Sequence, residues 1–294
     1  MQTARSIFLS QINGAADRPR AEFAGIVSDA AAVLTSNHPR PVWRAIMREV
    51  LAPDYSAVDV LSAMFAPAIE WILEGGEYRA AEVSNGLPFV ERAKIEKYGR
   101  ILPISRELAI NDRSLGFLAD MTGSLIASAY RHEGDAVFGA LTANANLADG
   151  SAWFGASNSV SAASVPTAIA DGISALRSQA YPDGQTGYLE PFAIVLPAAW
   201  SLAAADIPAE FLAKPPLIIH SAAVSDAYVI ADPAFNPTVA LLTMSPGAIP
   251  EVSSSTNAGH SFLVDAYATM KIRHDYAVVP LSRTGIIRAS VTEA

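Results

Sequence analysis

A long stretch with the pattern of a two-stranded ribbon, residues 71–105, constrains the fold of this chain more than any other feature. It reads WILEGGEYRAAEVSNGLPFVERAKIEKYGRILPIS and carries Asn85 and Gly86 near its middle. Asn-Gly between two extended runs is the strongest short-range hairpin signal, because both central residues of a type I′ turn need a positive φ angle. The arms would hold about 12 to 18 residues each, against roughly five or six in an ordinary strand. The sequence therefore predicts an extended β-hairpin.

The predicted ribbon is polar on both faces. Charged side chains of both signs follow its arms, at Glu74, Glu77, Arg79, Glu82, Glu91, Arg92, Lys94, Glu96 and Lys97. A two-stranded ribbon of this kind has no core of its own and is marginally stable in water. We expect it to lie on another body, and a second subunit is the obvious candidate. No apolar walls surround these carboxylates to raise their pKa toward neutrality, so ion pairs are favoured over an acid–base pair.

A helical pattern of about 32 residues follows the ribbon, from Asn111 or Asp112 to about residue 144, which is roughly 48 Å at 1.5 Å per residue. Asn111 and Asp112 are both good N-cap residues. An apolar stripe recurs at steps of three and four, at Leu118, Met121, Leu125, Ala129, His132, Ala136 and Ala140. A helix of this length outside a coiled coil acts as a strut.

The rest of the chain mixes helices and strands. Helices are predicted at 21–37 and 41–51, and residues 56–72 fit either a short strand or a short helix. From about 146 to 257, helices alternate with buried apolar strands, including a helix at 166–180, a strand at 188–197 and a helix at 198–213. This alternation is typical of a compact α/β unit. Two antiparallel strands are predicted after residue 258.

Composition excludes several classes of protein. Hydrophobic residues make up 51% of the chain, enough for a core, and the absence of cysteine excludes disulfide scaffolds, thiol nucleophiles and thiolate metal sites. The net charge of −9 argues against a protein that grips a nucleic-acid backbone, since such binding needs clustered basic side chains. Pro197, Asp206 and Pro208 interrupt the most apolar stretch, and no signal peptide opens the chain. We expect no membrane span.

The chain carries few candidates for chemistry. Neither GxGxxG, GxxxxGK nor HExxH occurs, and GASNS at 155–159 lacks the second glycine of a nucleophile elbow. We interpret His132 as a packed or surface residue of the long helix. His274 next to Asp275 could form a proton-transfer pair, but a strand residue on a polar face is favoured. Trp153 with Phe154 is favoured as a core anchor over a base-stacking platform. We therefore expect no catalytic residue, cofactor or metal.

Several segments in order resemble a known family. KYGRILPISRELAIND at 97–112, followed by a long helix, is similar to the centre of tailed-phage major capsid proteins of the Hong Kong 97-type fold, in the Mu-like major head subunit branch. DGSAWF at 149–154, YLEPFAIVLPAAWSLAA at 188–204, AYVIADP at 227–233 and MKIRHDYAVVPLSRTG at 270–285 agree with it, so the resemblance covers about 70–290. GASNSV after Phe154 replaces the branch's histidine and Asn-Leu pair, and SRTG replaces its Trp-Arg-Gly.

The resemblance implies an α+β fold with named parts. These are an N-terminal arm and helices (1–52), the start of a peripheral domain (53–70), an extension loop hairpin (71–105), the peripheral domain with its spine helix (106–145), an α/β axial domain (146–257) and return strands of the peripheral domain (258–294). In such proteins the extension loop lies over the neighbouring subunit. The assembly interface would then include Glu74, Glu77, Arg79, Asn85, Gly86, Arg92, Lys94 and Lys97.

The resemblance also implies a function without catalysis. Identical subunits would form the hexamers and pentamers of an icosahedral phage head, through heterologous contacts. The shell would enclose double-stranded DNA of a tailed phage or prophage without sequence-specific binding, after assembly in the cytoplasm of the host bacterium. A portal, and possible scaffold, maturation protease or decoration proteins, are the expected partners. Two alternatives stay open: an encapsulin-like nanocompartment shell that holds a cargo enzyme, and an unrelated α/β enzyme.

Overall fold

The chain divides into two compact units. The structure is a computed structural model, and it describes residues 20–61, 90–111, 116–181, 186–187, 189–202, 215–245, 247, 249–255 and 266–292. Unit 1 comprises Met1–Pro41, Ile95–Gly134 and Thr243–Tyr276, and unit 2 comprises Val42–Lys94, Asp135–Leu242 and Ala277–Ala294. Helix α4 (Gly116–Ala143) and strand β11 (Ala266–Pro280) each contribute residues to both units.

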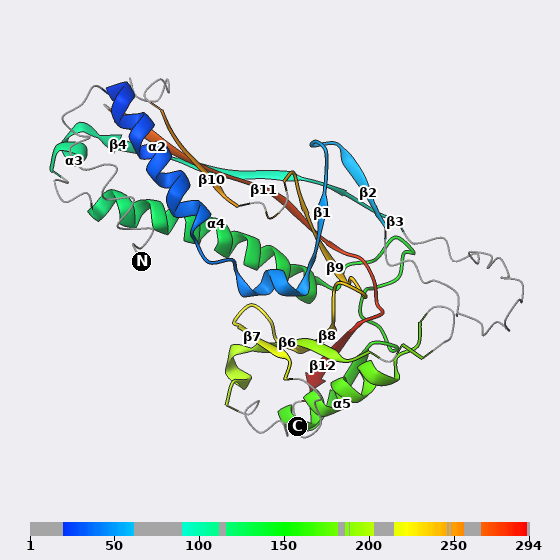
Figure 1. Ribbon diagram of the computed structural model, residues 1–294. Helices are drawn as coiled ribbons and strands as arrows, with labels where there is room; N and C mark the ends of the chain where they lie inside the picture. The colour runs from blue at the N-terminus through cyan, green and yellow to red at the C-terminus, as the bar shows by residue number, and fades with distance from the viewer. Residues whose placement is uncertain are drawn as a thin grey trace, which may run out of the picture. The chain divides into compact units, whose positions relative to one another are not determined.

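Unit 1 is built on an antiparallel sheet whose central strand is β11. Strand β10 (Glu251–Ser255) pairs with one edge of β11, and strand β4 (Glu96–Ser105) pairs with the other edge of β11. In Figure 1, helix α2 (Arg20–Ser36) runs along β10, against which it packs. The helix forms because small and apolar side chains recur at helical spacing, and these are buried: Phe23, Ala24, Val27, Ala30 and Ala31. The helix predicted at 21–37 is therefore confirmed.

The long helix is confirmed, but its buried face is not the predicted one. A separate helix α3 (Arg106–Asn111) precedes α4, and Ser105 Oγ caps it by accepting a 3.1 Å hydrogen bond from the backbone N–H of Leu108. Asn111 is thus the last residue of α3 rather than an N-cap, and Asp112 lies outside the described residues. On α4 the buried positions are Leu118, Ala119, Thr122, Ile126, Tyr130, Glu133, Gly134, Val137, Phe138 and Leu141. This stripe shares only Leu118 with the prediction, and His132 is exposed.

The second predicted helix, at 41–51, is wrong. Val42–Ile46 forms one short 3₁₀ turn, η2, and Arg48–Leu51 forms strand β1. In the sheet order, β1 lies beside β9 (Val239–Thr243), which lies beside β11. Strand pairing gives hydrogen-bond partners to backbone N–H and C=O groups that the ends of a short isolated helix would leave unpaired. The strand is therefore more stable here than the helix that the side-chain pattern suggests.

The base of the predicted ribbon is a two-stranded sheet. Strand β2 (Ala57–Leu61) pairs antiparallel with β3 (Val90–Lys94), so 56–72 begins with a strand. The predicted second arm was drawn through Ser105, but its later part, β4, pairs with β11 in unit 1. The turn at Asn85 and Gly86, with all of residues 62–89, lies outside the described residues.

Unit 2 contains an α/β sheet of five strands in the order β5-β12-β8-β6-β7. Its strands are β5 (Ser159–Ala162), β6 (Pro191–Pro197), β7 (Leu217–Ser221), β8 (Ala227–Ala231) and β12 (Ile286–Val291). Helix α5 (Val165–Ser178) packs its buried Ile169, Ile173 and Leu176 against this sheet. The predicted helix at 166–180 and the strand at 188–197 are confirmed. A helix was also predicted at 198–213. Within the described residues of this range the structure has the 3₁₀ turn η3 (Ala198–Trp200), and most of the range lies outside the described residues.

The sequence predicted one antiparallel pair of strands at the end of the chain, and this prediction is wrong. Strand β12 leaves β11 and enters the α/β sheet, where it runs antiparallel to β8 and parallel to β5. Ile286, Ile287 and Ala289 are buried there, and a strand with so little polar surface is most stable between two others. Gly285, at φ 92°, permits the turn into β12 where a side chain would be strained.

Candidate functional site

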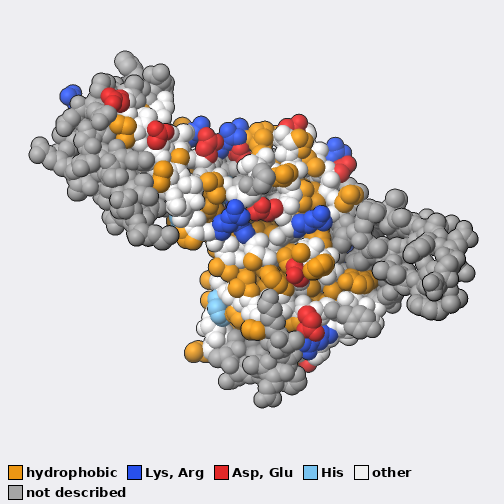
Figure 2. Space-filling model, in the orientation of Figure 1, with side chains coloured by type: hydrophobic (Ala, Val, Ile, Leu, Met, Phe, Trp, Pro, Cys, Tyr) orange, Lys and Arg blue, Asp and Glu red, His pale blue; other side chains and the backbone are white. Residues whose placement is uncertain are grey.

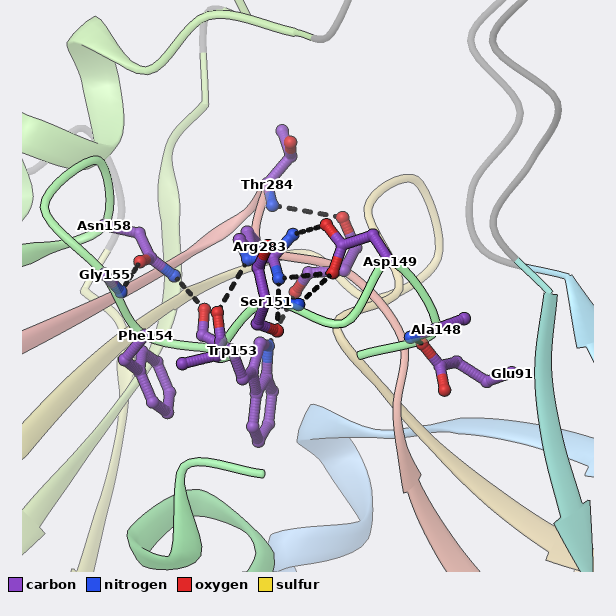
Figure 3. A network of polar contacts seen from close by, with 12 residues as sticks. Glu91, Ala148, Asp149, Ser151, Trp153, Phe154, Gly155, Asn158, Arg283 and Thr284 are labelled. Atoms are coloured by element: carbon purple, nitrogen blue, oxygen red, sulfur yellow. Dashed lines mark hydrogen bonds and ion pairs between the residues drawn. The ribbon is translucent and has the colours of Figure 1, made fainter. Parts of the chain in front are cut away.

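An ion pair between Arg283 and Asp149 holds two loops of unit 2 together (Figure 3). Arg283 Nη1 lies 2.5 Å from Asp149 Oδ2, and Nη2 lies 2.9 Å from Oδ1. The same guanidinium donates from Nε to the carbonyl of Ala152 at 2.8 Å and from Nη2 to the carbonyl of Ser151 at 2.6 Å. We call these four residues the clasp. One side chain of the β11–β12 turn thereby fixes the loop that follows α4.

Hydrogen bonds within the clasp shift the pKa values of both of its charged side chains. Hydrogen bonds from Arg283, with a further one from the backbone N–H of Ser151, lower the pKa of Asp149 from 3.8 to about 2. In return, the hydrogen bond to Asp149 raises the pKa of Arg283, and the charge of Glu91 adds to this effect. The guanidinium and the carboxylate of Asp149 therefore both stay charged over the whole physiological pH range, which suits a structural link.

Aromatic side chains form the floor of this region. Trp153 is fully buried and its indole N–H donates a 2.8 Å hydrogen bond to the carbonyl of Ser282. Phe154 stacks on Trp153, with ring centroids 4.8 Å apart. The amide of Asn158 donates to the carbonyl of Trp153 at 3.0 Å and accepts from the N–H of Gly155 at 2.8 Å. The interpretation of Trp153 as a core anchor is confirmed.

Glu91 connects the ribbon base to the loop of the clasp. Its Oε1 accepts a hydrogen bond from the backbone N–H of Ala148 at 2.5 Å (Figure 3). In the antiparallel register Glu91 faces Val60, and cross-strand partners share a face of the sheet. Val60 is buried and Glu91 is half-buried, whereas the next residues along, Leu61 and Arg92, are exposed. The described part of the ribbon therefore has an inward and an outward face, and is not equally polar on both.

The structure describes three of the predicted interface residues, and all three are exposed. Arg92 and Lys94 lie on the exposed outward face of β3 in unit 2. Lys97 is exposed on β4, in unit 1. The other five predicted residues, Glu74, Glu77, Arg79, Asn85 and Gly86, lie outside the described residues. Their role in assembly stays a prediction.

Unit 1 holds a second polar cluster, around a buried carboxylate. Glu133 on α4 and His274 on β11 are both buried, and Glu133 Oε2 lies 2.8 Å from His274 Nε2. Neighbouring His132 Nδ1 lies 2.6 Å from the hydroxyl of Tyr276. The polar-face interpretation of His274 is therefore wrong, and Asp275 pairs with Arg273 instead. His274 is drawn inward because Glu133, which no local pattern places in a core, supplies its partner.

A groove of about 420 Å³ opens beside this cluster, lined by residues of β4, α4 and β11 that include Tyr98, His132 and Tyr276. The described residues contain no group of three or more His, Asp or Glu side chains placed to hold a metal ion. Nor do they contain a helix long and apolar enough to cross a membrane.

Sequence reasoning missed Glu91, Asp149, Arg283 and Glu133 as residues that organise the molecule. A local signal existed for Asp149 alone. Asp-Gly-Ser at 149–151 is typical of an Asx turn, and Asp149 Oδ1 does accept a 2.9 Å hydrogen bond from the N–H of Ser151. The partner of each missed residue lies far away in the chain, 134 positions in the case of Arg283 and Asp149.

The sequence model of a family described as "Phage capsid protein" matches residues 89–289, more than half of the chain. The chain belongs to the phage capsid protein family. The match begins one residue before β3 and ends in β12, so it includes the clasp, Glu91 and the Glu133–His274 pair. This capsid protein is therefore a structural subunit of a phage head, located in the virion capsid, and it assembles with copies of itself. Its placement in the Mu-like branch stays a prediction.

Solved structures show the same fold. A virus-like particle from Pyrococcus furiosus matches with a TM-score of 0.54 at 11% identity, over 91% of the capsid protein and 99% of that chain. A phage-related protein from Bordetella bronchiseptica RB50 matches with a TM-score of 0.52 at 10% identity, over 91% and 95% of the two chains. The predicted α+β capsid fold is thus confirmed. No curated protein matches the chain in sequence.

The described part of the visible face offers no nucleic-acid clamp. Figure 2 shows that basic and acidic side chains are interspersed over the described part of the visible face, without a patch of a single sign. Sequence-independent binding to a phosphate backbone needs clustered Lys and Arg.

Proposed function

We propose that the capsid protein forms hexamers and pentamers that tile an icosahedral shell around the double-stranded DNA of a tailed phage or prophage. The observation that carries this proposal is the two-faced ribbon base. Its inward face is attached to unit 2 through Val60 and Glu91, while its outward face presents Arg92 and Lys94 to solvent. A short sheet fixed on one side and charged on the other supports an intersubunit role for the loop that it carries.

The contacts between subunits are heterologous in this proposal. The extension loop of one subunit, with Glu74, Glu77, Arg79, Asn85 and Gly86, lies over its neighbour together with Arg92, Lys94 and Lys97. A surface that contacts a different surface of the next copy generates rings, which is what hexamers and pentamers require. Charges of both signs along the loop would set its register on the neighbour.

The net charge of the chain supports the proposed enclosure of DNA. A net charge of −9 leaves the wall weakly repulsive toward a packaged genome, so DNA is held by confinement and remains free to leave. Assembly takes place in the host bacterial cytoplasm, with a portal and possible scaffold, maturation protease or decoration proteins as partners. The capsid protein itself has no catalytic role in this scheme.

Electron microscopy of the purified particles tests the symmetry. We expect closed shells in which capsomers with fivefold and sixfold symmetry are both visible. Discrete rings, or open sheets without fivefold positions, would overturn the proposal.

The contents of the shell distinguish a phage head from the encapsulin-like alternative. The fold alone does not distinguish them, because a virus-like particle has the same fold. Particles purified from cells that carry the complete phage or prophage are treated with nuclease and then opened. A phage head yields protected genome-length DNA, whereas a nanocompartment yields a cargo protein and no such DNA.

A further inference from the structure

The turn between β8 and β9 presents one aromatic side chain to solvent. Phe235 is 80% exposed, and among the described residues no other phenylalanine is as exposed. Its neighbour Ala234 is exposed too, but Pro233 and Asn236, on either side of this pair, are buried. Single exposed apolar side chains are common on protein surfaces and need no explanation by themselves. Phe235 differs from such residues because the backbone beneath it is fixed.

Hydrogen bonds within the turn hold its backbone. The carbonyl of Asp232 accepts hydrogen bonds from the N–H of Phe235 at 3.2 Å and from the N–H of Asn236 at 2.9 Å. The side chain of Asp232 adds a third bond, since its Oδ1 accepts from the N–H of Ala234 at 2.9 Å. Pro233 restricts φ at the second position of the turn, where proline is favoured. The backbone therefore has little freedom to fold the aromatic ring back onto the surface.

The same turn is tied at both ends to the β11–β12 turn. The N–H of Ala231 donates to the carbonyl of Gly285 at 2.8 Å, and the N–H of Leu281 donates to the carbonyl of Thr238 at 2.8 Å. Between these two bonds the chains pack closely, because a Cβ added to Gly285 would lie 3.0 Å from the Cβ of Asn236. All of these residues belong to unit 2. The exposed ring thus stands on a rigid base.

A ring presented in this way is suited to bind a pocket on another molecule. Its apolar surface gains free energy when it leaves water, and a backbone that is already fixed loses little entropy on association. Aromatic anchors in desolvated pockets carry much of the binding energy of protein–protein contacts. The fold itself gains little from a side chain that is 80% exposed, so an effect of Phe235 on assembly can be measured separately from stability.

A second copy of the chain is the partner that these observations support. The chain belongs to the phage capsid protein family and assembles with copies of itself, and interfaces of permanent assemblies are more apolar than other surfaces. We propose that Phe235 anchors a contact between subunits, with its ring inserted into an apolar pocket of the neighbouring copy. This inference deepens the proposed function and rests on it, since it requires the shell.

Four substitutions test the ring and the turn separately. Phe235→Ala removes the ring, and Phe235→Leu keeps an apolar side chain of smaller size. Asp232→Ala removes the acceptor of the bond from Ala234 but leaves the ring in place. Leu202→Ala removes a side chain of unit 2 that is 87% exposed, and it is the matched control for the loss of exposed apolar surface.

The first measurement is the protein concentration at which half of the subunits are in shells, determined by sedimentation for each full-length variant. Phe235→Ala should raise this concentration at least about tenfold, because an anchor of the contact is lost. Phe235→Leu should raise it less. Asp232→Ala should raise it although the ring is present, and Leu202→Ala should leave it unchanged. Urea unfolding of unassembled subunits should give the same midpoint for Phe235→Ala as for wild type.

A single thiol reports directly whether this position is covered in the shell. The chain has no cysteine, so Phe235→Cys introduces the only thiol. Its subunits are assembled with a large excess of wild-type protein and are then treated with N-ethylmaleimide. Labelling should be at least about tenfold slower in shells than in free subunits, because the reagent must wait until the contact opens. Ser174→Cys, at an exposed position of α5, shows how fast the reagent reaches the protein in a shell.

The outcomes that overturn the inference differ from those that overturn the proposed function. Half-assembly of Phe235→Ala at the wild-type concentration, or equally fast labelling of Phe235→Cys in shells and free subunits, would remove the anchor and leave shell assembly intact. Equal slowing at Ser174→Cys would attribute the protection to the shell wall, which also counts against the contact. An effect of Leu202→Ala as large as that of Phe235→Ala would contradict the role of the fixed turn. Wild-type protein that forms no shell at all would overturn the proposed function as well.

Discussion

The carboxylate of Glu133 on α4 lies 2.8 Å from Nε2 of His274 on β11, and both side chains are buried within unit 1. The rings of Tyr130 and Tyr276 lie near the imidazole, at centroid distances of 6.1 Å and 4.8 Å. A buried carboxylate without a partner would be expensive, so the imidazole and the carboxylate must be buried together. The pair thereby fixes the rotation of α4 against the sheet.

Removal of one partner of the Glu133–His274 pair should lower the free energy of unfolding. We expect Glu133→Ala to lower the free energy of unfolding by about 3–5 kcal/mol, because it leaves His274 buried without its acceptor. Asp135→Ala, two positions along the same helix and exposed, should change it by less than about 0.5 kcal/mol. Urea unfolding of each variant measures the difference. Similar effects for the two substitutions would show that the Glu133–His274 pair does not stabilise the fold.

The replacement of both partners tests the reason for that cost. Glu133→Leu combined with His274→Phe should recover most of the lost stability, because an apolar pair leaves no unsatisfied polar group. A double variant less stable than Glu133→Ala would contradict this explanation.

Acid should weaken the clasp over a defined pH range. The folded-state pKa of Asp149, about 2, lies below its ordinary value of 3.8, so the folded state holds its proton less tightly than the unfolded state. The resulting stability is complete above about pH 4 and is lost as the pH falls to about 2. Asp149→Asn should therefore be less stable than wild type at pH 7, by about 1 kcal/mol or less because solvent screens the pair. The difference should shrink as the pH falls below about 4 and vanish only below about pH 2, in unfolding measured across this range. A constant difference would contradict this account.

Two glycine substitutions should act in opposite directions. A Cβ on Gly99 of β4 would lie 2.5 Å from the backbone oxygen of Ile272 on β11, so Gly99→Ala should destabilise unit 1 by about 1–3 kcal/mol. Gly123 on α4 has no atom within 4 Å of the position of an added Cβ, so Gly123→Ala should stabilise the helix by up to about 1 kcal/mol. Thermal unfolding compares them. A Gly99→Ala variant at least as stable as wild type would refute the close approach of β4 to β11.

The outward face of the ribbon base should matter for assembly and little for folding. We expect Arg92→Glu combined with Lys94→Glu to lower the yield of particles by at least about tenfold, since like charges would then face each other across the contact. The free energy of unfolding should change by less than about 0.5 kcal/mol. Arg48→Glu, at an exposed position of β1, is the control. Normal yield from the double variant would remove Arg92 and Lys94 from the interface.

Local patterns in the sequence predict some elements of the fold and fail for others for identifiable reasons. Helix α2 is predictable because its buried residues recur at helical spacing, and strand β6 because it is a short apolar run that is almost entirely buried. The length of α4 is predictable too, but its rotation is not. Small residues such as Ala129 and Ala136 fit either face, and the buried face includes Glu133, which any hydrophobic pattern assigns to solvent. Only the pairing with His274 decides it.

Long-range pairing explains the remaining errors. Val90–Lys94 and Glu96–Ser105 read as one arm, yet they pair with β2 and β11, because strand partners are chosen by the whole sheet. Likewise Arg283 reads as a surface residue at the end of an apolar strand. Its four hydrogen bonds to the loop at 149–152 exist only once unit 2 has folded. The family was nevertheless predictable, since several short segments matched in order.

The mass of the wild-type protein in solution tests the central claim most directly. Light scattering or sedimentation of the purified capsid protein should detect closed particles that contain many copies of the 30.9 kDa chain. A stable single copy of the chain at every concentration and salt condition would contradict the account.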